Sequence, residues 1–454
     1  MANSRYTADD KSRIDRYKLY EDIFLGKHTA AFSKFSAEMV RKNKVLIYLV
    51  CNFGGLISKV SADLLFGESV GFKFAKDADK KSIDFINNFV SENDLHTKNY
   101  ESALSNSYYG DIVAKVWRDD KEKVYLDYLS PELLTVEYEN DNIRQPYRMI
   151  LGWVKNINGE QYLRREIHYK GKIENDIWLL KNDELRQKMN LKSFSEYANL
   201  PETQDTGVDN FLVRLIPNWR IAKAYFGLSD YIDLVSLFDE ANNRMSRIAE
   251  ILNKHSDPKL AVPPGVIRED GTVKGANFDL IEVNSQQTSL SKPEYITWDA
   301  SLESAFKEID KIVDFIFLFS ETSPAAFGMD KGGQAESGRA LKLKLIRTLA
   351  KISRKKNYYD SAIKWMLDVA QQLGGITKKS IPAIVWQDGI PADTLEQAQI
   401  EEIRLRAGNT SMESSIKRLD GGTDDDVNDE LDKIKGDQKA AAGTLGTNPP
   451  QVTL

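Results

Sequence analysis

Apolar residues recur every three or four positions through much of the chain, the spacing of helices that bury one face. The stripe over 228–255 would form a rod of about 40 Å, at 1.5 Å per residue. Ser229 or Asp230 can cap its start, and Asp257-Pro258 ends it. The pattern predicts helices over 43–66, 79–90, 228–255, 301–319, 338–373, 394–407 and 412–419.

From Asp111 the hydrophobic period falls to two, which is typical of strands with one buried face. The pattern predicts an antiparallel meander with strands over 112–117, 123–129, 133–138, 147–155, 162–170 and 173–180. Residues 181–210 are polar and irregular, so we expect a surface excursion there. A further short strand is expected over 381–386. The fold class that follows is α+β and mainly helical.

The segment between the helices 228–255 and 301–319 has a different character. Prolines and glycines interrupt short apolar runs at 260–262 and 280–283, which predicts a compact insert with short strands. The two helices would therefore form an antiparallel pair with a small module at one end. A glycine-containing loop over 321–338 leads to the third long helix, and the last twenty residues are expected to be disordered.

Composition narrows the function. The 454 residues include 62 basic and 68 acidic side chains, and the net charge of −6 argues against coating nucleic acid by bulk electrostatics. The single cysteine, Cys51, cannot form an internal disulfide. The longest apolar stretch, near 45–57, is too short to span a bilayer, and the polar start is unlike a signal peptide. We expect a soluble intracellular protein without a membrane partner.

Known catalytic motifs are missing from the sequence. The nearest match to a phosphate-binding loop, 328–333, has Gln334 where the lysine should stand, and no strand precedes it. No nucleophile elbow, His-Glu-x-x-His or paired Cys-x-x-Cys occurs, and the four histidines fall in different predicted elements. We therefore expect no cofactor, no metal site and no enzymatic activity. A nuclease that uses unrecognised carboxylates stays open as an alternative.

The most distinctive charge feature is the run 339–356, which holds eight basic residues and no acid. On a helix, residues three or four apart share a face, so much of this charge is presented together. An ordinary solvated surface, contact with a polyanion and contact with an acidic protein surface all stay open. The seven acids of 420–432 are one candidate partner. The face comprises Arg339, Lys342, Lys344, Arg347, Lys351 and Arg354.

Four phrases of the sequence agree in order and spacing with one family. They are Leu-Leu-Phe-Gly-Glu-Ser-Val-Gly-Phe at 64–72, Ser-Tyr-Tyr-Gly-Asp at 107–111 with 129–132 and 136–138, Pro-Asn at 217–218 with Gly-Leu-Ser-Asp-Tyr at 227–231, and Ser-Gly-Arg-Ala-Leu-Lys at 337–342. Together these phrases resemble portal proteins of tailed bacteriophages, of the type found in siphophages of Gram-positive hosts.

The resemblance implies a ring, usually of twelve copies, at one capsid vertex, through which double-stranded DNA is packaged and ejected. It implies a docking platform for the terminase large subunit and the head-tail adaptor, with scaffold and capsid proteins as further partners. The ring would be assembled in the host cytoplasm and reside in the virion. The implied parts are a wing (1–227), stem helices (228–255 and 301–320), a clip (256–300), a tunnel loop (321–338), a long helix returning to the wing (339–393) and a crown with an acidic tail (394–454).

Within this family picture, the tunnel loop would touch DNA phosphates without reading sequence, through Lys331, Gly332, Gly333 and Gln334. The basic face is then expected to meet a neighbouring subunit, because an uncompensated ring of cations would hold DNA. Phe306, Phe315 and Phe317 would be exposed on an isolated helix pair and would favour association. A head-tail adaptor or another capsid component is the alternative structural role.

Overall fold

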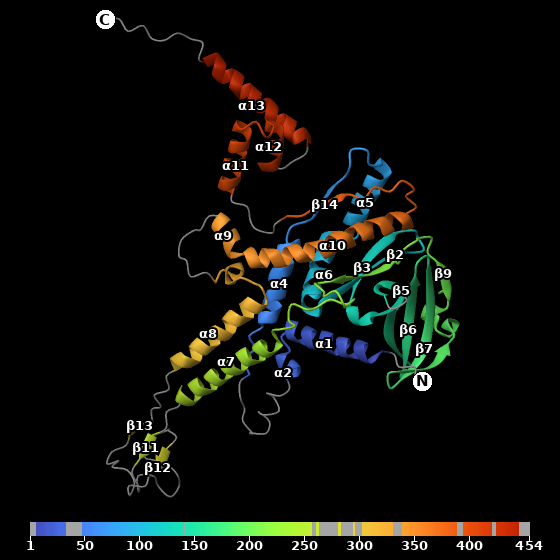
Figure 1. The fold of residues 1–454 in the computed structure, drawn as a ribbon, viewed down its shortest axis with the longest axis vertical. Helices are drawn as coiled ribbons and strands as arrows, with labels where there is room; N and C mark the ends of the chain where they lie inside the picture. Colours follow the sequence, from blue (N-terminus) through green and yellow to red (C-terminus); the bar gives the residue numbers. More distant parts are fainter. Residues whose placement is uncertain are drawn as a thin grey trace. The chain divides into compact units, whose positions relative to one another are not determined.

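The computed structural model describes residues 6–32, 48–139, 142–256, 260–262, 280–282, 294–295, 302–329, 338–387, 394–419 and 424–444 (Figure 1). They belong to two compact units. The first comprises Met1–Lys331 with Leu345–Gly389, and the second comprises Gly332–Lys344 with Ile390–Leu454.

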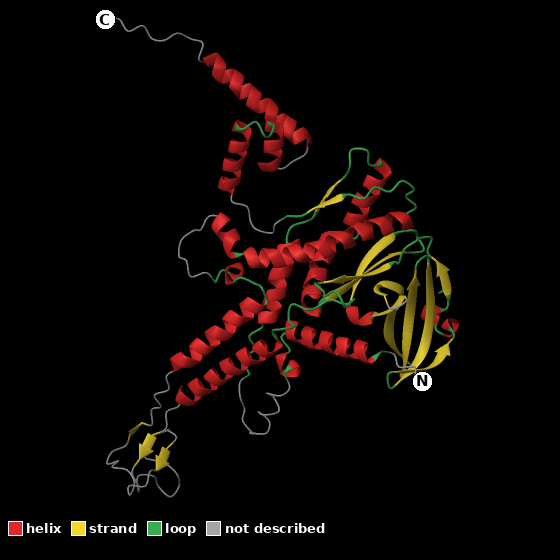
Figure 2. Ribbon diagram, in the orientation of Figure 1, coloured by secondary structure: helices red, strands yellow, loops and turns green. Residues whose placement is uncertain are grey.

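The α+β class is confirmed, since both helices and sheets are abundant (Figure 2). The helices of the first unit are α1 (Ala8–Phe24), α2 (His28–Ala31), α4 (Phe53–Phe66), α5 (Lys80–Glu92), α6 (Leu95–Tyr109), α7 (Val235–Ser256), α8 (Leu302–Phe319) and α10 (Ile346–Leu373). Those of the second unit are α9 (Gly338–Lys344), α11 (Thr394–Arg406), α12 (Met412–Leu419) and α13 (Asp424–Thr444).

The largest sheet is a meander in which each strand pairs antiparallel with the next along the chain. The expected meander is thus confirmed from residue 134 onward, but the region 181–210 is not merely irregular. Asn182 and Asp183 both adopt positive φ, 53° and 58°, which suits a tight hairpin and adds a strand. The strands are β4 (Leu134–Glu139), β5 (Asn142–Ile157), β6 (Glu160–Tyr169), β7 (Lys172–Lys181) and β8 (Glu184–Met189), with β9 (Thr203–Asp205) against β7.

A second sheet separates the first two predicted strands from the meander. β2 (Asp111–Arg118) pairs with β3 (Val124–Leu129) on one edge and with β10 (Val213–Pro217) on the other. The prediction of one continuous meander is wrong here, because β10 returns from nearly a hundred residues later to cover the edge of β2. The short β1 (Gly71–Lys73) likewise pairs with β14 (Ala383–Val385).

Short strands also occur in the predicted insert between α7 and α8. β11 (Leu260–Val262) pairs with β12 (Leu280–Glu282) and with β13 (Glu294–Tyr295). The strands expected at 260–262 and 280–283 are therefore confirmed. α7 and α8 themselves run antiparallel side by side (Figure 1), and Arg244 Nη2 lies 3.0 Å from Glu308 Oε1 across the pair.

α10 forms one wall of the main hydrophobic core. Ile352, Tyr359, Ile363 and Met366 recur at helical spacing and are buried, as the apolar stripe predicted. The ring of Tyr359 meets the ring of Phe66 edge-on at 4.9 Å between centroids, which joins α10 to α4. The helix is thus held in the middle of the first unit by its whole buried face.

Helix starts differ from the prediction at two places. Of the helix expected over 43–66, residues 43–47 lie outside the described residues and residues 48–52 are not helical. α4 begins at Phe53, where Asn52 accepts a hydrogen bond from the Gly55 N–H and caps the helix. The helix expected from 228 begins only at Val235. Asp230 turns its carboxylate toward lysines of α10 and does not act as a cap, and residues 230–234 form turns.

Two further predictions about helices are wrong. The helix expected over 338–373 is divided at Leu345, whose ψ of 2° interrupts the helical hydrogen-bond ladder. The last twenty residues are not entirely disordered, because α13 continues to Thr444. Its pairs Glu430–Lys433 and Asp432–Lys435, each 3.2 Å, have a spacing that supports a helix.

Candidate functional site

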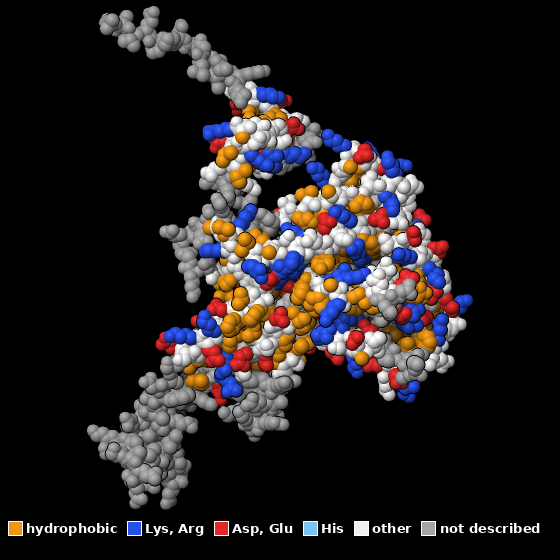
Figure 3. All heavy atoms as spheres, viewed as in Figure 1, with side chains coloured by type: hydrophobic (Ala, Val, Ile, Leu, Met, Phe, Trp, Pro, Cys, Tyr) orange, Lys and Arg blue, Asp and Glu red, His pale blue; other side chains and the backbone are white. Residues whose placement is uncertain are grey.

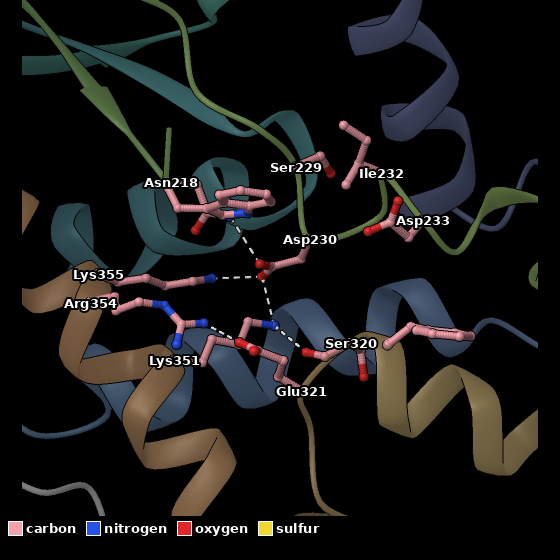
Figure 4. Close-up of a pocket in the computed structure, with 12 residues that line it drawn as sticks. Asn218, Ser229, Asp230, Ile232, Asp233, Ser320, Glu321, Lys351, Arg354 and Lys355 are labelled. Atoms are coloured by element: carbon pink, nitrogen blue, oxygen red, sulfur yellow. Dashed lines mark hydrogen bonds and ion pairs between the residues drawn. The ribbon is translucent and has the colours of Figure 1, made fainter. Parts of the chain in front are cut away.

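Three segments of the first unit meet in a pocket of about 330 Å³ (Figure 4). The loop before α7 contributes Asn218 and Asp230, the end of α8 contributes Ser320 and Glu321, and α10 contributes its basic side chains. These are the points at which the two stem-like helices begin and end, so the pocket lies where α7, α8 and α10 are joined.

Asp230 is the centre of this site, and its side chain is only 2% exposed. Its Oδ2 lies 2.6 Å from Lys355 Nζ and 3.1 Å from Lys351 Nζ, and it also accepts a hydrogen bond from the Ser107 hydroxyl at 2.7 Å. Asn218 Nδ2 donates to the other oxygen at 2.9 Å. The carboxylate thus has partners in the loop after β10, on α6 and on α10.

Charge governs the protonation of this cluster. Burial by itself would raise the pKa of Asp230, but the ammonium groups of Lys351 and Lys355 outweigh it and hold that pKa well below its ordinary value. Burial lowers the pKa of Lys355 to about 8, against the opposing attraction of Asp230. Two cations share one anion here, so the site carries a positive charge in its ionised form.

A second ion-pair set closes the rim of the pocket. Glu321, in the left-handed conformation directly after α8, pairs with Arg347 Nη2 at 2.7 Å and with the guanidinium of Arg354. Lys351 Nζ also donates to the carbonyl of Ser320 at 3.0 Å. The end of α8 is therefore tied to three successive turns of α10, and Figure 4 shows the contacts of Lys351 and Arg354.

The backbone beneath Asp230 is unusually close-packed. Gly110 has φ +92°, and a Cβ at this position would lie 2.4 Å from the Ser229 backbone nitrogen. A Cβ on Gly227 would lie 2.2 Å from the Gly110 carbonyl oxygen. The sequence phrases 107–111 and 227–231 are thus pressed against each other, and only glycine fits at their contact.

Asp111 lies in the same junction and is fully buried. Burial raises its pKa to about 7, although the Tyr17 hydroxyl and the Gly227 N–H both donate to the carboxylate, at 2.6 and 2.7 Å. The folded state therefore binds a proton more tightly than the unfolded state, and the stabilisation present below pH 4 is lost as pH rises through 7.

Asp111→Asn should remove that pH dependence, because the amide is isosteric and stays neutral. We expect the wild type to lose up to about 4 kcal/mol of unfolding free energy between pH 4 and pH 8 from this group, and the variant to lack this slope. Urea unfolding followed by tryptophan fluorescence across that range measures it. Parallel pH profiles of the two proteins would contradict the assignment.

The basic residues of the predicted face do not share a single solvated surface. Lys351 is buried on Asp230, with 7% of its side chain exposed, while Arg347 and Arg354 pair with Glu321 of the same chain. Lys342 and Lys344 belong to α9 in the second unit, and the side chain of Arg339 lies outside the described residues. Contact of this face with DNA or a neighbouring subunit stays a prediction.

The tunnel-loop residues Lys331, Gly332, Gly333 and Gln334 also lie outside the described residues. The prediction missed Asp230, Glu321 and Lys355 as a connected site. The basic run contained Lys355 and a family phrase contained Asp230, but nothing in the sequence linked the two. Over the described ranges, no helix could cross a membrane and no cluster of metal-ligating side chains occurs.

Comparison with known families settles the identity of the chain. The family model described as "Phage portal protein, SPP1 Gp6-like" matches residues 3–444. The chain belongs to this portal family. It is accordingly a portal protein of the capsid vertex, as the four phrases indicated, and the family match favours this role over that of an adaptor. No curated protein sequence matches the chain.

A comparison with solved structures finds chains of gene transfer agent particles. The neck of an empty gene transfer agent particle, computed with C6 symmetry, has 11% identity and a TM-score of 0.46, covering 81% of this chain and 89% of that chain. The virion of the native gene transfer agent particle has 12% identity, the same TM-score and the same coverage. The family assignment rests on the sequence match alone.

Proposed function

We propose that this portal chain forms a ring at the capsid vertex and guides double-stranded DNA during packaging and ejection. The observation that carries the proposal is the family match over 3–444. In this proposal, residues 1–227 are the wing, α7 and α8 the stem, 256–300 the clip, 321–338 the tunnel loop, 339–393 the long helix with its return to the wing, and 394–454 the crown. Terminase, the head-tail adaptor, and scaffold and capsid proteins dock on the ring, which assembles in the host cytoplasm.

Exposed apolar side chains on α8 support association into a ring. Phe306 and Phe315 are 47% and 45% exposed, and Leu318 and Phe319 are more exposed still. Figure 3 shows hydrophobic side chains gathered over this part of the first unit. A neighbouring copy would cover them, since large exposed apolar patches mark interaction surfaces. Phe317, expected among them, is instead buried against Phe53 and Phe327.

The Asp230 site suits a mechanical role. Lys351 and Lys355 fix α10, the long helix after the proposed tunnel loop, to the loop that starts α7. Arg347 and Arg354 fix the same helix to the end of α8. A rotation of the stem would therefore be carried to α10 through short ionic contacts, which couples the stem to the helix that supports the tunnel loop.

The ring itself is tested by electron microscopy of the purified protein. We expect end-on views with a central channel and rotational symmetry, usually twelvefold for a portal. A monodisperse monomer at micromolar concentration, with no rings in negative stain, would count against the proposal.

Deleting Met329–Gln334 should impair DNA packaging or retention much more than ring assembly, because the loop is proposed to contact phosphate and not the neighbouring subunit. The measurements are the packaged DNA per particle and the fraction of rings in negative stain. Deleting the six residues 449–454 is the length-matched control. Loss of rings in the loop deletion alone would contradict the assignment of this loop to the channel.

A further inference from the structure

A cleft of about 630 Å³ lies elsewhere in the first unit, between the start of β5, the strand β10 and the middle of α10. Four basic side chains line it, Arg144, Lys170, Arg214 and Arg220, against one carboxylate, Glu139. No role of the portal family assigned above uses it, and it shares no lining residue with the Asp230 pocket.

The three guanidinium groups are held in place by neutral acceptors. Arg144 Nη2 donates to the carbonyls of Ile221 and Ala222 at 3.2 and 2.9 Å. Arg214 donates to the carbonyl and the hydroxyl of Ser361 at 3.1 and 2.7 Å, and Arg220 donates to the Tyr225 carbonyl at 3.2 Å. Hydrogen bonds of this kind fix the positions of the side chains but leave their charges uncompensated.

The cleft differs from the Asp230 site, where the cations form ion pairs with a carboxylate. Across the described ranges, no carboxylate forms an ion pair with Arg144, Arg214 or Arg220. Burial lowers the pKa of Arg214, and repulsion from Arg220 adds to this effect. Burial also lowers the pKa of Arg220, with Arg144 as the repelling neighbour. Asp111 attracts Arg220 without forming an ion pair with it. Like charges packed this closely, with no ion-paired carboxylate, form a site that a further anion would stabilise.

The wall of the cleft is aromatic as well as basic. The Arg214 guanidinium lies 5.9 Å from the ring centroid of Trp365, and that of Arg220 lies 5.9 Å from the ring of Tyr358. Stacked arginines keep their planar donors oriented for bidentate contact with a carboxylate. An apolar wall next to such donors suits a peptide chain, which brings both carboxylates and carbon surface.

Duplex DNA fits this geometry less well. It is a stiff rod whose persistence length is about 50 nm, and its phosphates lie along its outside. Cations that hold such a rod must stand out from a surface, whereas Arg214 and Arg220 are recessed and only partly exposed. Side chains that protrude from a flexible segment can enter the cleft. We propose that the Arg144–Arg214–Arg220 cleft binds an acidic peptide segment of a protein partner.

The probe for the test is a fluorescent peptide with the sequence of residues 420–432, which contains seven acids and no base. The full-length protein should bind it in a salt-sensitive manner, and a version with Asn and Gln in place of the acids should not bind. Arg144→Gln, at an exposed position, should weaken binding at least threefold, and the triple variant R144Q/R214Q/R220Q should weaken it at least tenfold. Fluorescence anisotropy measures both.

The matched control is K121Q/K155Q/K181Q, which removes the same charge from exposed positions outside the cleft. It should bind the peptide like the wild type. Equal peptide affinity in the triple arginine variant and this control, or no binding to the wild type, overturns the proposal. The proposal is also overturned if the triple arginine variant loses affinity only for a 20-bp DNA duplex and not for the peptide, because nucleic acid would then be the ligand. Because ring formation is scored separately by microscopy, failure here leaves the portal role intact.

Discussion

Asp230→Asn should lower the free energy of unfolding by about 3–5 kcal/mol, the cost of leaving buried charges without their counterion. In the wild type, one carboxylate compensates Lys351 and Lys355, whose side chains are 7% and 3% exposed. The amide keeps the shape but removes the negative charge. Both carboxylate oxygens accept hydrogen bonds in the wild type, and the amide NH2 group cannot accept those of the oxygen that it replaces. The two ammonium groups would then repel each other inside the protein.

Equilibrium urea unfolding compares this variant with Asp233→Asn, which removes the same charge from an exposed position in the same loop. The control should change stability by less than about 0.5 kcal/mol. Replacing Lys351 and Lys355 by Met as well should restore much of the loss, because an apolar set can substitute for a buried ionic one. If Asp230→Asn matches the control, Asp230 is not the centre of the junction.

The deficit of Asp230→Asn should also depend on pH. Burial already lowers the pKa of Lys355, and without the carboxylate the attraction that opposes this effect is lost. The folded state then binds the Lys355 proton less tightly than the unfolded state, so stability should recover as pH rises from 8 toward 10 and Lys355 becomes neutral, and should fall again as pH is lowered. The same variant should loosen the connection of α10 to α7 and α8.

Gly110→Ala should destabilise the protein by a similar amount. The residue combines φ +92° with a backbone neighbour so close that a Cβ would lie 2.4 Å from the Ser229 nitrogen. We expect about 1–2 kcal/mol from the left-handed conformation and a further 1–3 kcal/mol from the steric overlap. Because a backbone atom cannot rotate away as a side chain can, the loop that carries Asp230 must shift.

Gly159→Ala separates the two causes. Gly159 has φ +82°, close to that of Gly110, but nothing lies within 4 Å of its Cβ position. Its substitution should therefore cost only the conformational part, about 1–2 kcal/mol. Thermal or urea unfolding of the two variants gives the difference. Equal destabilisation would mean that the contact between 107–111 and 227–231 does not constrain the junction.

Local patterns in the sequence carried much of the architecture. In α8 and α10, apolar residues recur every three or four positions. This spacing is local, so each helix could be predicted from a short stretch of sequence. The alternation of apolar and polar residues from 134 to 181 likewise predicted the meander, because strands linked by hairpins pair with their neighbours along the chain. The order and spacing of the four phrases indicated the portal family from the sequence alone.

The sequence by itself thus determined the class, the helices, most of the strands and the family. Tertiary structure alone decided that β10 covers the edge of β2, that Asp230 serves as a counterion and not as a helix cap, and that Lys351 is buried while Arg214 and Arg220 face a cleft. Periodicity reports which face of an element is apolar, but a charge within a basic run looks the same whether it meets water or a carboxylate. That choice depends on contacts more than a hundred residues apart, which only the folded chain brings together.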